Sequence, residues 1–285
     1  MTERRRNPYL PFVRMLGLAA LAALALMTMA PFLWMVLTSL KTQQEAFAYP
    51  PTLLPRNGPQ WQNYTQLFTL VPFGRYFLNT VIVTGAVVVG QLLISSMAAY
   101  AFARLRFVGR DTIFLFYLAT MMVPFQVTLI PLYLLVVQLG WVNTYWGLIA
   151  PGLSSAYGIF LLRQAFLTQP EELADAARID GASEYGIYWR IFLPLNGPAL
   201  ATVGVFAFLG TWTDLLWPLL IVRDQNLRTL ELGLAYFNSA VPQFVQPNWP
   251  LLMAAAVVVM LPVIVVYLFT QRYFTEGIAL TGVKG

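Results

Sequence analysis

The chain has 285 residues, of which 59% are apolar and only 10% are charged, and its mean hydropathy is +0.66. Soluble domains carry about 25% charged residues, so this composition indicates an all-α protein that crosses a membrane several times. The chain has no cysteine and no histidine, which excludes disulfides, histidine metal sites and catalytic pairs that need either residue.

Long uncharged runs indicate where the chain crosses the bilayer, because roughly 20 apolar residues span its hydrocarbon core. The run 112–162 is too long for one crossing, and it is interrupted at residues 140–143. We therefore predict one transmembrane domain over residues 1–285 with six helices. The expected spans are residues 15–37, 76–103, 112–137, 144–162, 199–222 and 251–271. The first run resembles a signal peptide with Ala30 at a cleavage site, but it continues to Leu37, so we expect an uncleaved span.

The net charge of +5 follows from topology if both termini are cytoplasmic. That arrangement places 12 of the 17 basic residues inside, as the positive-inside rule requires. The residues expected inside are Arg4, Arg5, Arg6, Arg14, Arg104, Arg106, Arg110, Arg163, Arg178, Arg190, Arg272 and Lys284. Those expected outside are Lys41, Arg56, Arg75, Arg223 and Arg228. The basic excess thus needs no nucleic-acid partner, and membrane lipid is the expected environment.

Two segments are expected outside. Residues 38–75 are rich in proline and aromatic residues, which favours an ordered cap over a flexible linker. Residues 223–250 have room for a short helix around 230–237. Either segment could receive a soluble external partner or simply connect two spans.

The most informative segment is a polar one at residues 168–198, between two apolar runs. Pro170 and the acidic residues after it predict a helix from Glu171 to Asp180. Gly181 is placed to end this helix in a left-handed conformation, and Ser183 is placed to cap a second helix.

The side-chain spacing predicts one contact face on each of these helices. On the first helix Leu173, Ala176 and Ala177 are expected to share a face, beside an ion pair between Asp175 and Arg178. On the second, the apolar face is expected to comprise Tyr185, Tyr188, Trp189 and Phe192.

This segment resembles the EAA loop of binding-protein-dependent ABC importer permeases. The consensus is EAA, three residues, G, nine residues, I, one residue and LP. The sequence matches it at Ala176, Ala177, Gly181, Ile191 and the Leu-Pro pair ending at Pro194. Asp175 stands where the family usually has glutamate, so the carboxylate is retained on a shorter side chain.

The resemblance extends over nearly the whole chain to the carbohydrate-uptake group, in particular to the maltose-permease G-type subunit. Further matching segments are residues 39–41, 50–55, 123–126, 212–218 and the C-terminal 282–285. The resemblance implies a sugar-transport permease in a bacterial or archaeal cytoplasmic (inner) membrane. Its implied partners are a second permease subunit in a heterodimer, two ATP-binding subunits, and a periplasmic or lipoprotein substrate-binding protein.

The resemblance also implies roles for particular residues. The helix at 171–180 would be the coupling helix that docks into the ATPase. The implied coupling residues are Glu172, Asp175, Ala176, Ala177, Asp180, Gly181 and Pro194. The C-terminal tail, residues 277–285, would also reach the ATPase pair.

The chain has no phosphate-binding loop of the form GxxxxGK[ST], so ATP hydrolysis must come from another subunit. We therefore expect no enzyme activity, cofactor or metal in this chain, with ATP and magnesium bound by the ATPase partners.

Polar and aromatic residues within the predicted spans are candidates for the substrate pathway, because sugar hydroxyls need amide, carboxylate and aromatic partners. They are Asn79, Gln91, Gln126, Trp212 and Asp214. The alternative is structural, since polar residues commonly hold transmembrane helices together, and Asp214 could bond its neighbours Thr211, Trp212 or Thr213.

Two other functions compete with the importer hypothesis. A proton-coupled secondary carrier would use Asp214 as its titrating group, but would leave the polar segment 168–198 without a role. An intramembrane enzyme is disfavoured by the missing histidine and cysteine. The substrate itself stays open among monosaccharides, disaccharides, oligosaccharides and glycerol phosphates.

Overall fold

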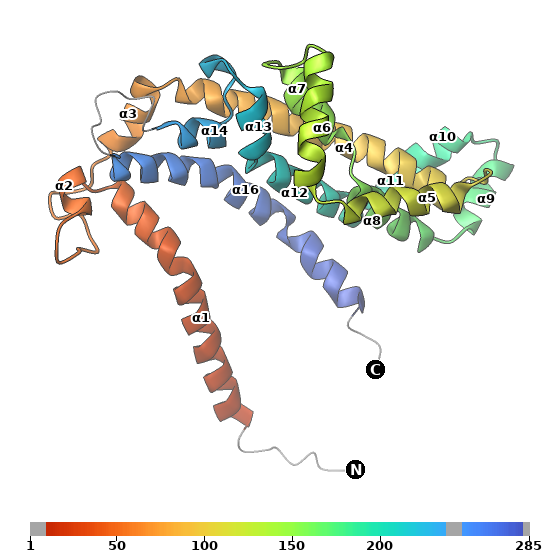
Figure 1. Ribbon diagram of the computed structural model, residues 1–285. Coiled ribbons are helices and arrows are strands. Elements are labelled where there is room, and N and C mark those ends of the chain that lie inside the picture. The colour runs from red at the N-terminus through yellow and green to blue at the C-terminus, as the bar shows by residue number, and fades with distance from the viewer. Residues whose placement is uncertain (1–9, 238–246, 282–285) are drawn as a thin grey trace, which may run out of the picture. The chain divides into compact units, whose positions relative to one another are not determined.

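The structure is a computed structural model that describes residues 10–237 and 247–281, with side chains for 12–237 and 247–271 (Figure 1). The described residues form helices and turns and contain no β-strand, in agreement with the predicted all-α class. The chain divides into two compact units. The first comprises Met1–Val71 and Phe237–Val258, and the second comprises Pro72–Tyr236 and Val259–Gly285.

The first unit contains α1 (Leu10–Ser39), α2 (Gln43–Ala46), α3 (Gln62–Leu70) and the beginning of α16 (Trp249–Thr281). Its connecting segment is ordered by buried polar groups. Lys41 is 2% exposed, donates from Nζ to the carbonyl of Thr52, and lies 4.6 Å from the ring centroid of Trp34. The Asn63 amide donates to the carbonyls of Ser39 and Lys41 at 2.8 and 3.1 Å. Residues 38–71 therefore form a folded cap rather than a loose linker.

The second unit is built on α4 (Phe73–Arg104). The two helices that pack on it most extensively are α8 (Ala156–Leu167) and α12 (Gly197–Trp212). Two buried apolar clusters lie along α4. One is near its C-terminal end and includes Tyr100, Phe166 and Phe192, and the other includes Val83 and Trp217.

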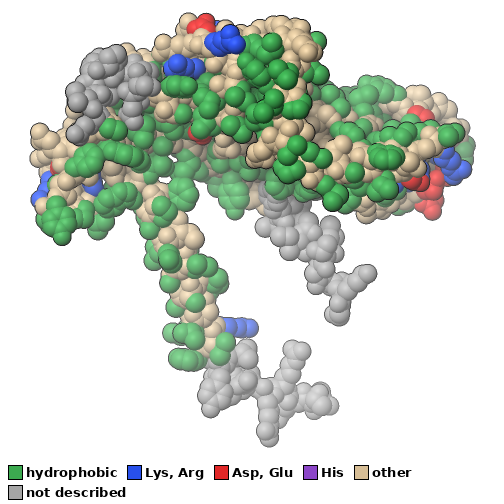
Figure 2. Space-filling model, viewed as in Figure 1, with side chains coloured by type: hydrophobic (Ala, Val, Ile, Leu, Met, Phe, Trp, Pro, Cys, Tyr) green, Lys and Arg blue, Asp and Glu red, His purple; other side chains and the backbone are tan. Residues whose placement is uncertain are grey.

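The remaining helices of the second unit are short. They are α5 (Arg110–Ala119), α6 (Phe125–Gln138), α7 (Tyr145–Ile149), α9 (Glu172–Ile179), α10 (Glu184–Ile187), α11 (Leu193–Leu195), α13 (Leu216–Ile221) and α14 (Leu230–Ala235). In Figure 2 basic and acidic side chains gather at the end of this unit that carries α9 and α10, while apolar side chains cover much of the visible face elsewhere.

Three described helices are long and apolar enough to cross a membrane: Phe12–Ser39, Phe73–Arg104 and Trp249–Gln271. They coincide with the predicted first, second and sixth spans. Three bent pairs raise the number to as many as six if each pair is one span. The bends are 103° for Arg110–Met122 with Phe125–Gln138, 40° for Tyr145–Leu153 with Ala156–Leu167, and 82° for Glu184–Leu195 with Gly197–Trp212.

The break predicted at residues 140–143 is present, with positive φ at Gly140 (68°) and Asn143 (59°). None of the spans predicted over 112–137, 144–162 and 199–222 is one continuous helix. The first is interrupted at residues 123–124, the second at 154–155, and the third between Trp212 and Leu216. Transmembrane helices tolerate such breaks where side chains bond the freed backbone groups.

The helix expected around residues 230–237 is α14. The rest of that loop, residues 238–246, lies outside the described residues, as do Arg4 to Arg6 and residues 282–285 of the C-terminal tail. The cytoplasmic placement of both termini stays a prediction.

Candidate functional site

The polar segment folds as predicted from its local signals. Gly181 has φ of +81°, and the amide of Ala182 donates to the carbonyl of Ala177 at 2.9 Å, which closes the C-terminal end of α9. The hydroxyl of Ser183 accepts from the amide of Gly186 at 3.2 Å and so caps α10. The result is a helix, a glycine turn and a second helix.

The inner face of α9 differs from the predicted one. Ala174 is fully buried, and Ala177 packs against the same apolar cluster within the chain. Of the predicted shared face, Leu173 and Ala176 are exposed, whereas Ala177 is partly buried against the cluster, so only part of that face is free. A small side chain at Ala174 lets α9 approach the cluster closely.

The outer face of α9 is exposed and partly apolar. Ala176 is exposed, Leu173 is 39% exposed and Ile179 is 87% exposed. These positions recur every three residues and so lie along one side of the helix. Exposed apolar side chains in a row on a helix that is anchored on its other side form a surface suited to a partner. Two other predicted coupling residues, Glu172 and Asp180, are also exposed at the two ends of α9.

The second helix also departs from the predicted pattern. Residues Tyr188–Phe192 form a π turn, in which Tyr188 and Phe192 are buried while Tyr185 and Trp189 are 62% and 44% exposed. The single apolar face expected over these four aromatic residues is therefore split. A π turn accommodates more residues per turn than an α-helix, so the regular α spacing no longer brings all four side chains to one side.

An ion-pair network joins α9 to α10 and α4. Arg178 contacts Asp175 from Nη1 and Glu184 from Nε, each at 2.8 Å. The second oxygen of Glu184 accepts from the hydroxyl of Tyr100 at 2.7 Å. The hydrogen bond to Glu184 raises the pKa of Arg178, helped by a smaller contribution from Asp175, so the guanidinium stays charged.

The predicted pair between Asp175 and Arg178 is thus confirmed. Sequence reasoning missed Glu184 and Tyr100, because Glu184 is on a different helix and Tyr100 is distant in sequence. No spacing rule relates them to Arg178.

Further bonds connect the segment to the long helices. The hydroxyls of Tyr188 and Ser96 lie 2.8 Å apart. Asn196, which is buried, donates to the carbonyl of Phe192 at 2.8 Å and accepts from Gln169 at 3.3 Å. Pro194 lies in α11, which follows the π turn directly and ends one residue later at Leu195. These contacts join the segments on either side of α9 to α4 and to the start of α12.

A polar cavity of about 230 Å³ lies among α4, α8 and α12, at the candidate residue Gln91. Gln91 is half-buried and makes no protein hydrogen bond among the described residues. Tyr157 and Thr211 also line this cavity. Amide and hydroxyl groups beside an aromatic ring are the kinds of group that bind a hydroxylated ligand.

Asn79, another of the polar candidates, already forms hydrogen bonds within the chain. The Asn79 amide is fully buried, donates to the carbonyls of Asn226 and Arg228 at 2.8 and 2.9 Å, and accepts from the Tyr145 hydroxyl at 2.6 Å. Asn79 therefore has no free donor or acceptor pair to offer a ligand in this conformation.

Asp214 lies at the break between α12 and α13. Its Oδ1 accepts from the amide of Trp217 at 3.2 Å, which caps the start of α13. The partner is thus Trp217 rather than the expected Thr211, Trp212 or Thr213. Thr211 lines both the polar cavity and the small space beside Asp214, so the two places adjoin.

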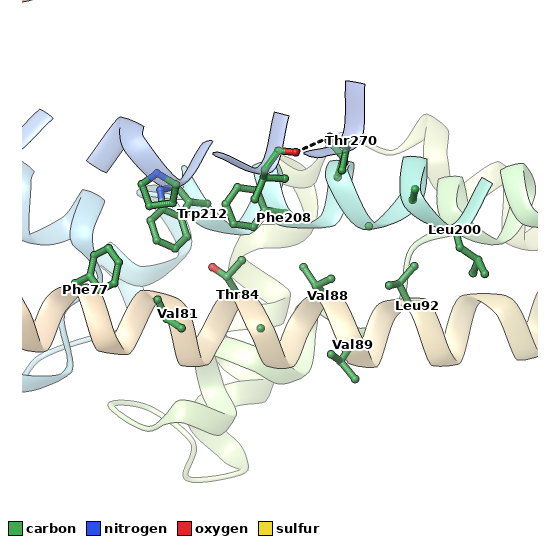
Figure 3. A pocket seen from close by; sticks show the side chains of 16 residues that line it. Phe77, Val81, Thr84, Val88, Val89, Leu92, Leu200, Phe208, Trp212 and Thr270 are labelled. Carbon is green, nitrogen blue, oxygen red and sulfur yellow. Dashed lines mark hydrogen bonds between the residues drawn. The ribbon is translucent and has the colours of Figure 1, made fainter. Parts of the chain in front are cut away.

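Trp212 and Gln126, the last two candidates, do not line the cavity at Gln91. The Trp212 indole donates to the carbonyl of Val259 at 3.0 Å and stacks on Phe208 with centroids 5.3 Å apart. Figure 3 shows both rings facing Phe77 and Thr84 of α4 across an apolar groove of about 610 Å³. Gln126 is exposed at the start of α6. The structure therefore does not bring the five predicted pathway residues into one site.

Among the described residues no cluster of three or more acidic side chains is placed to hold a metal ion. The features that remain as candidates are the outer face of α9 and the polar cavity at Gln91.

Known proteins similar to this chain were found at the levels of family, sequence and fold. The family described as "binding-protein-dependent transport system inner membrane component" matches residues 91–279. The arabinooligosaccharides transport system permease protein AraQ of Halalkalibacterium halodurans is 36% identical, over 99% of this chain and 100% of that protein. The sn-glycerol-3-phosphate transport system permease protein UgpE of Yersinia pestis is also 36% identical, over 82% of this chain and 84% of that protein.

The fold is that of a solved bacterial ABC transporter that imports the acidic polysaccharide alginate. The TM-score is 0.82 at 23% identity, over 94% of this chain and 99% of that chain. At this identity the likeness concerns the fold alone. The matched family and the nearly full-length relatives show that the chain belongs to the inner membrane components of binding-protein-dependent transport systems, the permeases of ABC importers.

Proposed function

We propose that this chain is a permease subunit of an ATP-driven importer for a carbohydrate, an oligosaccharide or a related polyol. The relatives named above are described as permeases for arabinooligosaccharides and for sn-glycerol-3-phosphate, and the fold neighbour imports alginate. All three cargoes are hydroxyl-rich, which is the shared chemistry that supports this substrate class.

We further propose that α9 is the coupling helix and that its outer face docks into an ATPase subunit. The supporting observation is the contrast between the two faces of α9. Its inner face is anchored by the buried Ala174, and its outer face exposes Leu173, Ala176 and Ile179. A helix held in this way can transmit the movement of a partner to the spans. Asp175, which replaces the usual glutamate, pairs with Arg178 and so helps to hold the end of α9.

The proposed partners follow from the same family. They are a second permease subunit, two ATP-binding subunits that hold ATP and magnesium, and an external substrate-binding protein in a bacterial inner membrane. A solved structure of the alginate transporter contains its alginate-bound periplasmic protein, which supports the last of these partners. No observation favours an archaeal membrane.

The polar cavity at Gln91 is the proposed point of contact with substrate in this subunit. Its unbonded amide and the neighbouring Tyr157 and Thr211 are chemically suited to sugar hydroxyls. Asp214 is assigned to the helix break instead, so no observation favours the proton-coupled carrier.

The coupling proposal is tested by placing a charge on the outer face of α9. Ala176→Glu should leave the chain inserted and folded, because Ala176 is exposed, but should reduce ATPase retention on a tagged chain at least about tenfold. Uptake should fall in parallel.

The matched control is Ala235→Glu, which adds the same charge at an exposed position of α14. It should retain the ATPase subunits fully. Normal ATPase retention by Ala176→Glu would refute the docking face. Ala177→Glu is a poorer probe, since Ala177 packs inside the chain and its replacement disturbs folding as well.

A further inference from the structure

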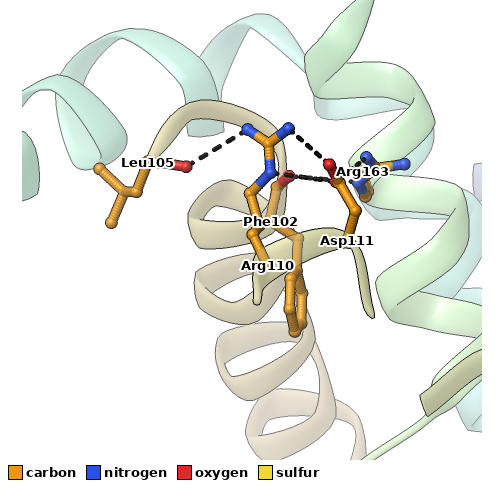
Figure 4. Close-up of polar contacts among 5 residues, drawn as sticks. All are labelled: Phe102, Leu105, Arg110, Asp111 and Arg163. Atoms are coloured by element: carbon orange, nitrogen blue, oxygen red, sulfur yellow. Dashed lines mark hydrogen bonds and ion pairs between the residues drawn. The ribbon is translucent and has the colours of Figure 1, made fainter. Parts of the chain in front are cut away.

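Four arginines, Arg104, Arg106, Arg110 and Arg163, lie near the C-terminal end of α4, and among the described residues Asp111 is the one carboxylate that contacts any of them. Arg110 and Arg163 both contact Asp111 Oδ1, at 3.1 and 3.5 Å. Arg110 also donates to the carbonyl of Leu105, and Arg163 to that of Phe102, as Figure 4 shows. Asp111 therefore already serves two of the four guanidinium groups.

The other two arginines have no acidic partner within 4 Å in the part of the chain that the structure describes. Arg104 donates from Nη2 to the carbonyls of Phe166 and Gln169 and lies 4.7 Å from the centroid of Phe192. Its Nε is buried without a hydrogen-bond partner. Arg106 is exposed and bonds to no described group.

Three of the four arginines line two hollows, which share Arg106 and Arg110. One has a volume of about 480 Å³ and the other about 540 Å³, the latter also lined by Arg104 and Gln169. Glu171 is on the rim of the larger hollow and is the one acidic residue there. Arginines outnumber carboxylates in both hollows, since Asp111 is the one acidic residue that lines the smaller hollow. The half-buried Arg104 has only carbonyl groups and an aromatic ring beside its charge, so an anion in the larger hollow would be stabilised there.

The surroundings of the hollows are apolar. Val108 is 99% exposed, Phe107 is 43% exposed and Leu167 is 44% exposed. α4 has 32 residues and so extends about 48 Å, well beyond a hydrocarbon core of about 30 Å. Arg75 and Arg104 are its only charged residues and mark its two ends, so both ends are expected among the lipid headgroups. A ligand that combines a negative group with an apolar tail fits both parts of this surface.

We infer that the hollows lined by Arg104, Arg106 and Arg110 bind the phosphate of an anionic phospholipid headgroup. Guanidinium groups are well suited to phosphate oxygens, and basic pockets between transmembrane helices bind anionic lipid headgroups. The exposed Val108 and Phe107 then contact the acyl chains. Because Arg104 also holds the carbonyls of Phe166 and Gln169, the bound lipid supports the chain just before α9.

The test uses the transporter assembly purified in neutral detergent through a tag on this chain. Dioleoylphosphatidylglycerol and dioleoylphosphatidylcholine are added separately, and retained lipid is counted by native mass spectrometry. The wild type should retain the anionic lipid in preference to the zwitterionic one. Arg106→Gln should weaken retention of the anionic lipid about fivefold, the effect of about one basic residue near the headgroups.

Two variants control this result. Arg106→Lys keeps the charge and should bind the anionic lipid within about twofold of the wild type. Arg223→Gln removes the same charge at an exposed position near the opposite end of α4 and should bind as the wild type does.

Several outcomes would overturn the inference. Equal retention of both lipids, or an equal loss in Arg223→Gln, would mean that the binding is not at this site. Displacement of the lipid by excess inorganic phosphate would indicate a site for free anions. If Arg106→Gln keeps its lipid but loses ATPase subunits, the arginines bind a protein instead.

Discussion

The polar segment 168–198 and the polar groups around Asn79 and Asp214 interrupt the same apolar chain in different ways. In the segment, charged side chains are partly exposed and bond one another, as Arg178 does with Asp175 and Glu184. Around Asn79 and Asp214, polar side chains bond the backbone instead. The segment therefore leaves a surface for a partner, whereas the groups within the helices replace backbone bonds lost where helices end.

The largest effect should come from Asn79→Leu. The change leaves two carbonyls and the Tyr145 hydroxyl without their buried partner. A buried group that loses its partner costs at least about 1 kcal/mol, so three such groups should lower the free energy of unfolding by roughly 3 kcal/mol. Thermal aggregation of the detergent-purified chain should begin at a clearly lower temperature.

Gln126→Leu is the control, because Gln126 is exposed and bonds to no described group. It should leave the aggregation temperature nearly unchanged. If Asn79→Leu is as stable as the wild type but loses uptake, Asn79 belongs to the substrate pathway and does not serve the structural role assigned to it.

A smaller effect is expected at Gly181, where φ is +81° and a Cβ would meet no atom within 4 Å. Gly181→Val should cost about 1–2 kcal/mol through backbone strain alone. Hydrogen exchange at the end of α9 should accelerate, and ATPase retention should weaken.

Gly181→Asn serves as the matched variant, since asparagine adopts the left-handed conformation more readily. It should fall between the wild type and Gly181→Val. Equal losses in both variants would point to a direct clash with a partner rather than to strain in α9.

The smallest effect is expected from Asp214→Asn. Asparagine caps a helix about as well as aspartate, so the free energy of unfolding should change by less than about 0.5 kcal/mol. Uptake in proteoliposomes should keep its rate and affinity. A marked loss of uptake with unchanged stability would restore Asp214 as a pathway or proton-binding residue.

Local chemistry explains which parts of the polar segment were predictable. The Gly181 cap, the Ser183 cap and the pair between Asp175 and Arg178 each depend on residues a few positions apart. The break at residues 140–143 and the three long spans are similarly local, since composition and length decide them.

Features that depend on distant residues were not predictable in this way. Ala177 is partly buried because Ala174, on the same side of α9, packs against a cluster that includes Phe166 and Phe192. Trp212 was expected on the pathway because of its type, but it faces an apolar groove whose wall is formed by α4 and α16. Its indole N–H donates a hydrogen bond to the backbone carbonyl of Val259.

By itself the sequence determined that the protein is helical, crosses a membrane, and carries the EAA-type segment of an importer permease. Hydrophobic length, helix caps and motif spacing are properties of neighbouring residues, so they can be read without a fold. Only the tertiary structure decided which face of α9 is free, which polar groups are already bonded, and that Arg104 and Arg106 lie beside a pair of arginines that shares Asp111. These facts depend on burial and on contacts between residues that are far apart in the chain.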